Sequence, residues 1–268
     1  MNPIIAILSD FGHSDSYVAS MKGVILSINP SVLLIDISHG VPRGDVFAGA
    51  FCLASCLENF PPSTIFLAVV DPGVGTERCA IALQGKNYSL IGPDNGLLAL
   101  AAKRMSHVST RRLENYALFR SKKCSATFHG RDVFAPAAAH LSLGFPFEEL
   151  GAIVQNPLDL PWPPLVQSST EIQGQIIYVD HFGNCVTNIP EQACMKLQTS
   201  LKQNGVLQVS SGNKKMPLLK TFGAVPAGEA LAYVGSEALL ALAVNKGNAS
   251  SKLQLHVGDA VVVQQIST

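Results

Sequence analysis

The chain has 268 residues, enough for one large domain or two domains of ordinary size. Only 14% of the residues are charged, against an average of about 25%, and 47% are hydrophobic, so much of the chain can be buried in cores or subunit interfaces. The positive and negative side chains balance to a net charge of zero. This balance provides no basic surface for nucleic acid or for an anionic membrane, and it is compatible with a homo-oligomer.

The sequence shows no signal for export, for membrane insertion or for metal binding. The first apolar run stops at Asp10 and has no basic region before it, so we expect no signal peptide and no membrane span. The six cysteines are scattered without a CxxC pair, and the seven histidines show no HxxxH or HxH spacing, so we expect no metal site. Free thiols are typical of a reducing compartment, and we therefore expect a cytoplasmic protein.

The first half of the chain alternates short apolar strands with helical patterns. Continuous apolar strands that alternate with helices are typical of parallel βαβ units, in which helices cover both faces of the sheet. The expected strands are at 3–8, 32–37 and 64–70, with a further pair around 79–91. The expected helices are at 17–28, 45–57, 96–103 and 135–143.

The composition and the hydrophobic pattern of the sequence change after this half. Three prolines in LDLPWPPLVQSS and the absence of a helical period predict a stiff, extended linker. We therefore expect an α/β N-terminal catalytic domain over 1–157, a Pro-rich linker over 158–169 and a smaller antiparallel β-barrel domain over 170–268. Short alternating segments predict the strands of that barrel or of a sandwich, and one helical stretch at 237–245 is expected to interrupt them. The predicted strands are at 171–180, 205–212, 230–235, 252–258 and 260–265.

Polar residues gather in the turns that follow the predicted strands, where ligands bind in open parallel sheets. In one such turn Asp71 ends a strand and Arg78 lies seven residues further on, which also fits an ordinary β-turn with an aspartate cap. In another, His129 precedes Gly130 between a strand and a helix, where a histidine can be structural or can transfer protons. No GxSxG elbow supports a Ser-His-Asp hydrolase, and the Gly-x-Gly beside Asp71 lacks the Lys-Ser/Thr ending of a phosphate loop.

Other short polar side chains occupy turns of the same kind. Asp10, Asp94, Asp180 and Asn184 can each cap the backbone of a turn. Carboxylates in such turns can also accept hydrogen bonds from the paired hydroxyls of a ribose. The spacing of these residues does not decide between the two roles.

The order and length of the motifs resemble those of the S-adenosyl-L-methionine (SAM) hydroxide adenosyltransferases, or SAM hydrolases, which are related to the fluorinases and chlorinases. The resemblance extends over nearly the whole chain. It includes the following segments: SDFGHSDSYVASMKG, NPSVLLIDISHGVPRGDVFAGA, TIFLAVVDPGVGTER, IGPDNGLL, TFHGRDVFAPAAAHL, YVDHFGNCVTNI and GSEALLALAVNKGNAS.

This resemblance implies an α/β N-terminal domain, a C-terminal β-barrel domain and a homotrimer that binds substrate where one subunit's N-terminal domain meets the next subunit's C-terminal domain. It implies that SAM is hydrolysed to adenosine and L-methionine with no cofactor, since SAM is itself the substrate. By motif match, Asp71, Arg78 and His129 resemble the family's catalytic set. The alternatives are a SAM- or adenosine-binding module with negligible turnover and a halide-dependent adenosyltransferase, with a metal-dependent hydrolase as a more distant possibility.

The resemblance also implies a set of binding residues. Asp10 corresponds to the carboxylate on the ribose hydroxyls, and Asp180 and Asn184 to the groups that hold the ammonium and carboxylate of methionine. Ser236 and Glu237 match further contacts of the amino-acid end, and Phe222 matches an aromatic that packs on adenine. The remaining expected binding residues are Tyr17, Asp94, Asn95 and Gly130.

Two departures from the halogenating relatives point toward water as the nucleophile. By this resemblance, the halogenating relatives carry Tyr at the position of Asp71 and Tyr-Ser at the positions of His129 and Gly130. A carboxylate next to the nucleophile repels a halide anion. Val186 stands where the fluorinase has an aromatic residue, which implies a thinner pocket wall in the second domain.

Overall fold

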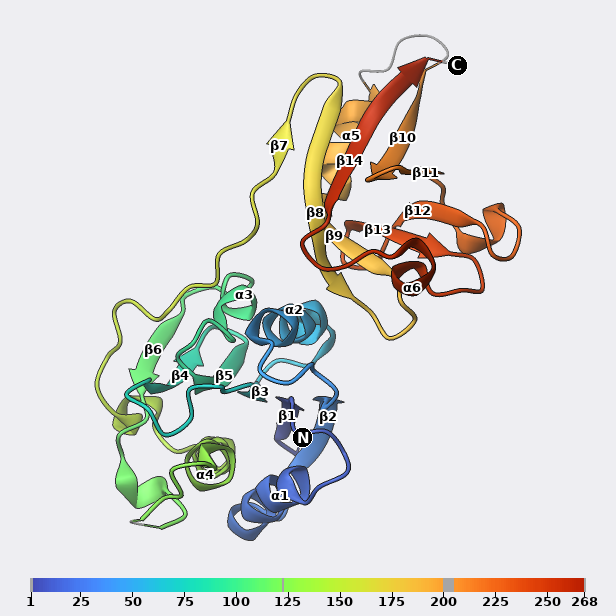
Figure 1. Ribbon diagram of the computed structural model, residues 1–268. Coiled ribbons are helices and arrows are strands. Elements are labelled where there is room, and N and C mark those ends of the chain that lie inside the picture. The colour runs from blue at the N-terminus through green and yellow to red at the C-terminus, as the bar shows by residue number, and fades with distance from the viewer. Residues whose placement is uncertain (1, 122, 200–204, 268) are drawn as a thin grey trace. The chain divides into compact units, whose positions relative to one another are not determined.

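A computed structural model describes residues 2–121, 123–199 and 205–267 (Figure 1). The chain divides into two compact units, Met1–Leu160 and Pro161–Thr268, and each is described by itself. The division falls within the segment 158–169 that the sequence predicts as a linker.

The N-terminal unit is built on a six-stranded mixed sheet in the order β2-β1-β3-β5-β4-β6. The first four strands in this order run parallel to their neighbours, and the last two pair antiparallel. The strands are β1 (Ile4–Ser9), β2 (Leu33–Ser38), β3 (Thr64–Val69), β4 (Ala80–Gln84), β5 (Tyr88–Pro93) and β6 (Ser109–Arg112). Because β3 lies in the middle of the sheet and is covered on both faces, all its residues are buried, as its continuous apolar sequence predicts.

Helices cover both faces of this sheet (Figure 1). Helix α1 (Tyr17–Ile28) lies beside α4 (Ala135–Ser142), and α2 (Val46–Cys56) lies beside α3 (Ala99–Ala102). Alanines and glycines let two of these helices pack closely: α4 buries Ala135 and Ala137–Ala139, and a Cβ at Gly49 of α2 would meet Leu97 at 2.8 Å. Short 3₁₀ turns lie at Leu57–Asn59, Tyr116–Leu118 and Phe147–Leu150, and a π-helical turn at Gly130–Phe134 leads into α4.

The C-terminal unit is an antiparallel, nearly closed barrel-like sheet in the order β11-β10-β14-β8-β9-β13-β12, with β7 paired to β8. The two ends of this sheet approach each other, because the Leu219 amide, just beyond β11, donates to the Ala232 carbonyl of β12 at 2.9 Å. The elements are β7 (Val166–Gln167), β8 (Glu171–Val179), β9 (Cys185–Pro190), α5 (Glu191–Thr199), β10 (Gly205–Ser211), β11 (Lys214–Pro217), a 3₁₀ turn at Phe222–Ala224, β12 (Ala230–Val234), β13 (Leu239–Val244), α6 (Ala249–Leu253) and β14 (Ala260–Ser267).

Two of the expectations for the C-terminal unit are wrong. The segment 237–245, predicted to be helical from its leucines and alanines, contains strand β13, which is held between β9 and β12. Burial between two strands outweighs the weak helical preference of such residues. The predicted strand 252–258 instead begins with the end of α6, which Asn248 caps through the Ser251 amide and which ends at Gln254 in the left-handed conformation.

The predicted helices of the N-terminal unit agree with the structure to within a few residues, and α1 has the predicted bounds, whereas α5 (Glu191–Thr199) was not predicted. Helix α2 begins after Asp45, whose carboxylate accepts from the Ala48 amide as an N-cap. The predicted helix 96–103 is shorter, because only Ala99–Ala102 is α-helical. Within the described residues, no helix is long and apolar enough to cross a membrane.

Candidate active site

The strand order places two of the predicted aspartates next to each other. Strand β1 pairs with β2 on one side and with β3 on the other, so the chain changes direction across the sheet at β1. Ser9 at the carboxyl end of β1 lies opposite Val69 at the end of β3. The turns that carry Asp10 and Asp71 therefore leave neighbouring strands at a topological switch point, the usual ligand site of such sheets.

Asp10, Tyr17 and Asp71 line one cavity of about 860 Å³ at this edge of the sheet. A volume of this size lies within the range of small-molecule sites, about 300–1,000 Å³. The other lining residues are Phe11, Asp15, Arg43, Gly44, Pro72, Val74, Ser125, Thr127, Phe128 and Arg131.

Asp71, Arg78 and His129 form a connected cluster. The Arg78 Nε donates to Asp71 Oδ1 at 2.9 Å and to Oδ2 at 3.0 Å, and Arg78 Nη2 also pairs with Oδ2. The same Nη2 lies 2.9 Å from Nδ1 of His129. The side chains of Asp71 and Arg78 are only 5% and 9% exposed, so this ion pair is shielded from water and salt. Three residues that lie up to 58 positions apart in the sequence thus form one hydrogen-bonded unit.

The contact with Arg78 fixes the tautomer of His129. A guanidinium only donates hydrogen bonds, so Nδ1 of His129 must carry a lone pair and the proton of the neutral ring must lie on Nε2. Burial lowers the pKa of His129, and the nearby positive charge of Arg78 lowers it further. Both effects favour the neutral imidazole, with Nδ1 accepting from Arg78 and the proton on Nε2. His129 and Arg78 lie behind Asp71 and do not themselves line the cavity.

A glycine holds the two loops of the cluster together. Gly75 has φ +78°, and a Cβ there would lie 2.3 Å from the carbonyl oxygen of Ala126. Only glycine allows this conformation and this close approach of two backbones without strain. The loop that presents Asp71 is thereby packed against the loop that precedes His129.

Three aromatic side chains in mutual contact border the same cavity. The rings of Phe11, Tyr17 and Phe128 contact one another with centroid distances of 5.3–5.8 Å, and the guanidinium of Arg131 lies 4.9 Å from the Phe128 centroid. Gly130 is buried behind them, where a Cβ would lie 3.4 Å from the Phe11 ring. Gly130 thus supports the packing of the aromatic wall, while its predicted contact with substrate stays a prediction.

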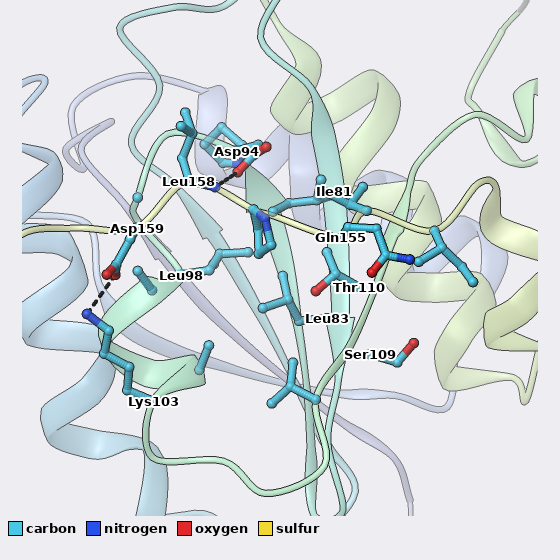
Figure 2. Close-up of a pocket in the computed structure, with 18 residues that line it drawn as sticks. Ile81, Leu83, Asp94, Leu98, Lys103, Ser109, Thr110, Gln155, Leu158 and Asp159 are labelled. Carbon is cyan, nitrogen blue, oxygen red and sulfur yellow. Dashed lines mark hydrogen bonds and ion pairs between the residues drawn. The ribbon is translucent and has the colours of Figure 1, made fainter.

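Asp94 and Asn95 have structural partners. Asp94 lines a different cavity of about 500 Å³, and its Oδ1 accepts from the Leu158 amide at 2.8 Å (Figure 2). The nearby Lys103–Asp159 ion pair, at 2.6 Å, fastens the same segment. The Asn95 side chain donates to the Val70 carbonyl and accepts from the Leu97 amide. These contacts account for both residues as anchors of the chain, and their binding role stays a prediction.

In the C-terminal unit, Asp180 and Asn184 close the turn between β8 and β9. Asp180 Oδ1 accepts from the Asn184 amide at 2.8 Å, and its Oδ2 accepts from Asn184 Nδ2 at 2.7 Å. Gly183 in this turn has φ +83° and lies against the Asn248 side chain, where a Cβ would come within 2.2 Å. The turn is therefore rigid, and it leaves the ring of Phe182 74% exposed.

The other predicted residues of this unit lie around Tyr233 of strand β12: Phe222 packs on its ring, and Ser236 and Glu237 follow the strand. The Phe222 ring is 4.7 Å from the Tyr233 ring, and Ser236 donates to Glu237 Oε1 at 3.1 Å. Burial raises the pKa of Tyr233, and the neighbouring carboxylates of Asp180 and Glu237 raise it further. An aromatic pair and two carboxylates thus gather at one end of the barrel.

Comparison with known proteins connects these two groups of residues to one family. The SAM hydroxide adenosyltransferase N-terminal domain matches residues 5–151, and the corresponding C-terminal domain matches residues 174–262. The chain belongs to the SAM hydroxide adenosyltransferase family. A relative from Thermus thermophilus named (R)-S-adenosyl-L-methionine hydrolase is 38% identical over 270 residues, which cover 96% of this chain and 98% of the relative.

The chain is also similar to a solved structure and to a halogenating enzyme. The crystal structure of an uncharacterized conserved protein from Thermotoga maritima is 40% identical and superposes with a TM-score of 0.89, covering 97% of this chain and 99% of that one. A fluorinase from an Actinoplanes species is 31% identical over 297 residues, which cover 98% of this chain and 97% of the fluorinase. The family resemblance inferred from the motifs is thereby confirmed.

The cavity of this SAM hydroxide adenosyltransferase family member also contains side chains that the sequence did not single out as binding residues. Two of them, Phe11 and Asp15, lie in the segment SDFGHSDSYVASMKG, and Phe128 and Arg131 lie in TFHGRDVFAPAAAHL. Their proximity to the predicted residues in these segments was the available signal. Arg43, which also lines the cavity, lies in the turn between β2 and α2. Tyr233, which the sequence also did not single out, lies in strand β12 of the C-terminal unit. Across 2–121, 123–199 and 205–267, no three His, Cys, Asp or Glu side chains gather as metal ligands.

Proposed function

We propose that this chain hydrolyses SAM to adenosine and L-methionine by in-line attack of water at C5′. The observation that carries this proposal is the buried Asp71–Arg78–His129 cluster, which a SAM or adenosine carrier without turnover would not require. Asp71 also lines a cavity with room for a nucleoside. Family membership and the SAM hydrolase relatives support the same activity.

The reaction demands a positioned nucleophile more than an acid. As the water oxygen bonds to C5′, the C5′–S bond breaks and its electron pair passes to sulfur, so the sulfonium departs as the neutral thioether of methionine. No proton has to be given to this leaving group. One proton of the attacking water must be released, and water with a pKa of about 15.7 releases it only with help from a base.

Each residue of the Asp71–Arg78–His129 cluster is suited to a different role in activating the water. Oδ1 of Asp71 accepts only from Arg78 Nε and keeps a free lone pair, whereas Oδ2 accepts from both Nε and Nη2, so Asp71 can accept the proton of the water through Oδ1. His129 can donate its Nε2 proton to the water oxygen and orient it, because Arg78 occupies Nδ1. Arg78 keeps its charge at every relevant pH and stabilises a hydroxide-like oxygen as the attack proceeds.

Substrate binding is assigned to both units. Asp10 is suited to the ribose hydroxyls, because it follows the carboxyl end of β1 and lines the cavity. Asp180 and Asn184 are assigned to the ammonium and carboxylate of the methionine part, and Phe222 to the adenine ring. Tyr17, Ser236 and Glu237 complete this assignment.

The assembly we propose is a homotrimer in the cytoplasm, with substrate held between the N-terminal domain of one subunit and the C-terminal domain of the next. The separation of the predicted catalytic and methionine-binding residues into two units supports this arrangement. Light scattering coupled to size-exclusion chromatography tests the trimer, and mixing of two inactive variants, one altered at Asp71 and one at Asp180, tests the shared site by complementation.

The sulfur stereochemistry of the substrate can also be proposed. The name of the Thermus relative carries the descriptor R in addition to L for the methionine carbon, so R denotes the sulfonium centre of its substrate. We infer that this chain prefers the same epimer. Incubation with a mixture of sulfonium epimers, followed by chiral chromatography, should show that the R form disappears first; equal rates would contradict the preference.

Hydrolysis itself is tested with SAM in ¹⁸O-labelled water and mass spectrometry of the products. Adenosine that carries ¹⁸O at its 5′ oxygen, in molar excess over protein, is expected. Binding of SAM without product would favour a carrier, and a 5′-halo product in halide buffer would favour halide transfer. Halide transfer is disfavoured because the carboxylate of Asp71 repels an anion near C5′.

A further inference from the structure

A chain of buried polar side chains runs behind the Asp10 turn and takes no part in the proposed chemistry. Ser9 Oγ lies 2.7 Å from Nδ1 of His39, and Nε2 of His39 lies 3.1 Å from Asp36 Oδ1. Lys22 of α1 donates to the other oxygen of Asp36 at 2.6 Å. Ser9 is 0% exposed and His39 is 1% exposed, so this chain is sealed from solvent except at Asp36 and Lys22.

The direction of every hydrogen bond in this chain can be assigned. The carboxylate of Asp36 only accepts, so Nε2 of His39 carries the proton and Nδ1 is an acceptor. Ser9 therefore donates its hydroxyl proton to Nδ1, and its oxygen is left to accept from the Phe11 amide at 3.3 Å. Each donor has one acceptor, as a buried network requires.

The network resembles a hydrolytic triad only in composition. In a Ser-His-Asp triad the serine bonds Nε2 and the aspartate bonds Nδ1, whereas His39 shows the reverse arrangement. The hydroxyl of Ser9 is fully buried and cannot reach a substrate. A structural or positioning role remains.

The contacts of this network converge on Asp10. The backbone carbonyl of His39 accepts from the Gly12 amide at 2.8 Å, and the Ser9 hydroxyl holds the Phe11 amide. The Asp10 carboxylate in turn accepts from the Gly44 amide at 2.8 Å, on the loop that follows His39. The residues before and after Asp10 are thus held against the loop between β2 and α2, and Asp10 itself lines the cavity.

We propose that Ser9 and His39 are positioning residues that fix the Asp10 carboxylate for binding of the ribose, with Asp36 holding the histidine ring. This inference rests on the proposed function, because it uses Asp10 as the ribose ligand. A preorganised carboxylate loses less conformational freedom when it binds two hydroxyls, so the network should act on affinity and leave the chemical step unchanged.

The test compares Ser9→Ala with a matched loss of a buried hydroxyl at the opposite end of the same sheet. Thr64 is 1% exposed, and its hydroxyl donates to the Pro61 carbonyl at 2.8 Å. Ser9→Ala should raise the KM for SAM and the Kd for adenosine by roughly 5–10-fold, the effect of one buried hydrogen bond, with kcat within about twofold. Thr64→Val should lower the melting temperature by about as much as Ser9→Ala does, and it should leave the KM for SAM and the Kd for adenosine unchanged.

Two further variants show whether the effect passes through Asp10. Ser9→Ala should change the adenosine Kd by less than about twofold when Asp10→Asn is already present, because coupled residues are not additive. Asp36→Asn retains an oxygen that can accept from His39, so it should keep a KM close to that of the unaltered protein, whereas Asp36→Leu should raise it.

The outcomes separate this inference from the proposed function. Unaltered protein that yields no adenosine but binds it would overturn the hydrolase, and the Kd values would still decide the role of Ser9. Active protein in which Ser9→Ala leaves KM and Kd unchanged, or lowers kcat alone, would overturn the positioning role. Full additivity with Asp10→Asn would also overturn it.

Discussion

The two groups of predicted site residues differ in how their polar atoms are used. In the N-terminal unit, Asp71 and Arg78 are almost fully buried and pair with each other and with His129 across two loops. In the C-terminal unit, Asp180 and Asn184 pair within one turn, next to a Phe182 ring that is 74% exposed. A shielded cluster is suited to holding charge at a reacting centre, and a rigid turn beside exposed rings is suited to capturing a ligand. Variants of the two groups should therefore fail in different kinetic constants.

The largest effect is expected at the proposed base. Asp71→Asn keeps the shape of the side chain but removes its ability to take a proton, so kcat should fall by about 10²–10⁴-fold, the usual contribution of a general base. The KM should change by less than about threefold. Steady-state kinetics of adenosine release measures both.

Asp132→Asn provides the control for this variant. Asp132 is a second buried carboxylate of the same unit, and it binds a guanidinium, that of Arg131, at 2.6 Å and 2.9 Å. Its loss should lower the melting temperature while retaining most of kcat. A similar collapse of kcat in both variants would show that Asp71 matters for folding of the site and not for proton transfer.

The pH profile should reveal the neutral state of His129. Its pKa is lowered by burial and by Arg78, so the neutral ring persists below pH 6.5 and is lost as the pH falls through the lowered pKa. The kcat should therefore fall about tenfold per pH unit on an acid limb centred below pH 6.5. Because the unfolded histidine binds more protons in this range, the free energy of unfolding should also decrease as the pH falls. An acid limb centred above pH 7 would contradict a neutral His129.

A smaller effect, on binding, is expected in the C-terminal unit. Asp180→Ala removes the carboxylate that holds the Asn184 side chain and is assigned to the substrate ammonium. The KM should rise by roughly 10–100-fold, as for loss of a hydrogen bond to a charged group, with kcat at saturation within about threefold. A variant with a large loss of kcat and an unchanged KM would remove the distinction between the two groups.

The smallest effect is expected for the aromatic residue assigned to adenine. Phe222 is 40% exposed and rests on Tyr233, so Phe222→Ala should raise the KM by about 2–10-fold, the value of one aromatic contact. Phe222→Tyr retains the ring and should behave like the unaltered protein. Equal losses in both variants would argue against stacking.

The sequence predicted the elements whose signals are local. The β-branched run at Thr64–Val69 and the continuous helical pattern at Tyr17–Ile28 each admit one structure, and both were predicted correctly. Leu239–Val244 carries leucines and alanines that suit a helix, and only its position between two strands makes it a strand. Such pairings depend on residues far away in the chain, so a local pattern cannot contain them.

The same distinction applies to the site. The turns drew attention to Asp71, Arg78 and His129, the family resemblance named them as the catalytic set, and the structure brings the three together. Asp94 lies in a turn of the same appearance, yet its carboxylate anchors the Leu158 amide. Tyr233 could not be singled out, because only the folding of the barrel buries it beside the carboxylates of Asp180 and Glu237, which raise its pKa.

The contact of Gly75 with Ala126 has a consequence for laboratory evolution of this protein. Any side chain at position 75 must displace a carbonyl from 2.3 Å and adopt an unfavourable φ of +78°. Libraries that randomise the 71–78 loop to alter the nucleophile should therefore keep this glycine fixed. Diversity introduced at Val74, which lines the cavity, can change the chamber without separating the two loops that form it.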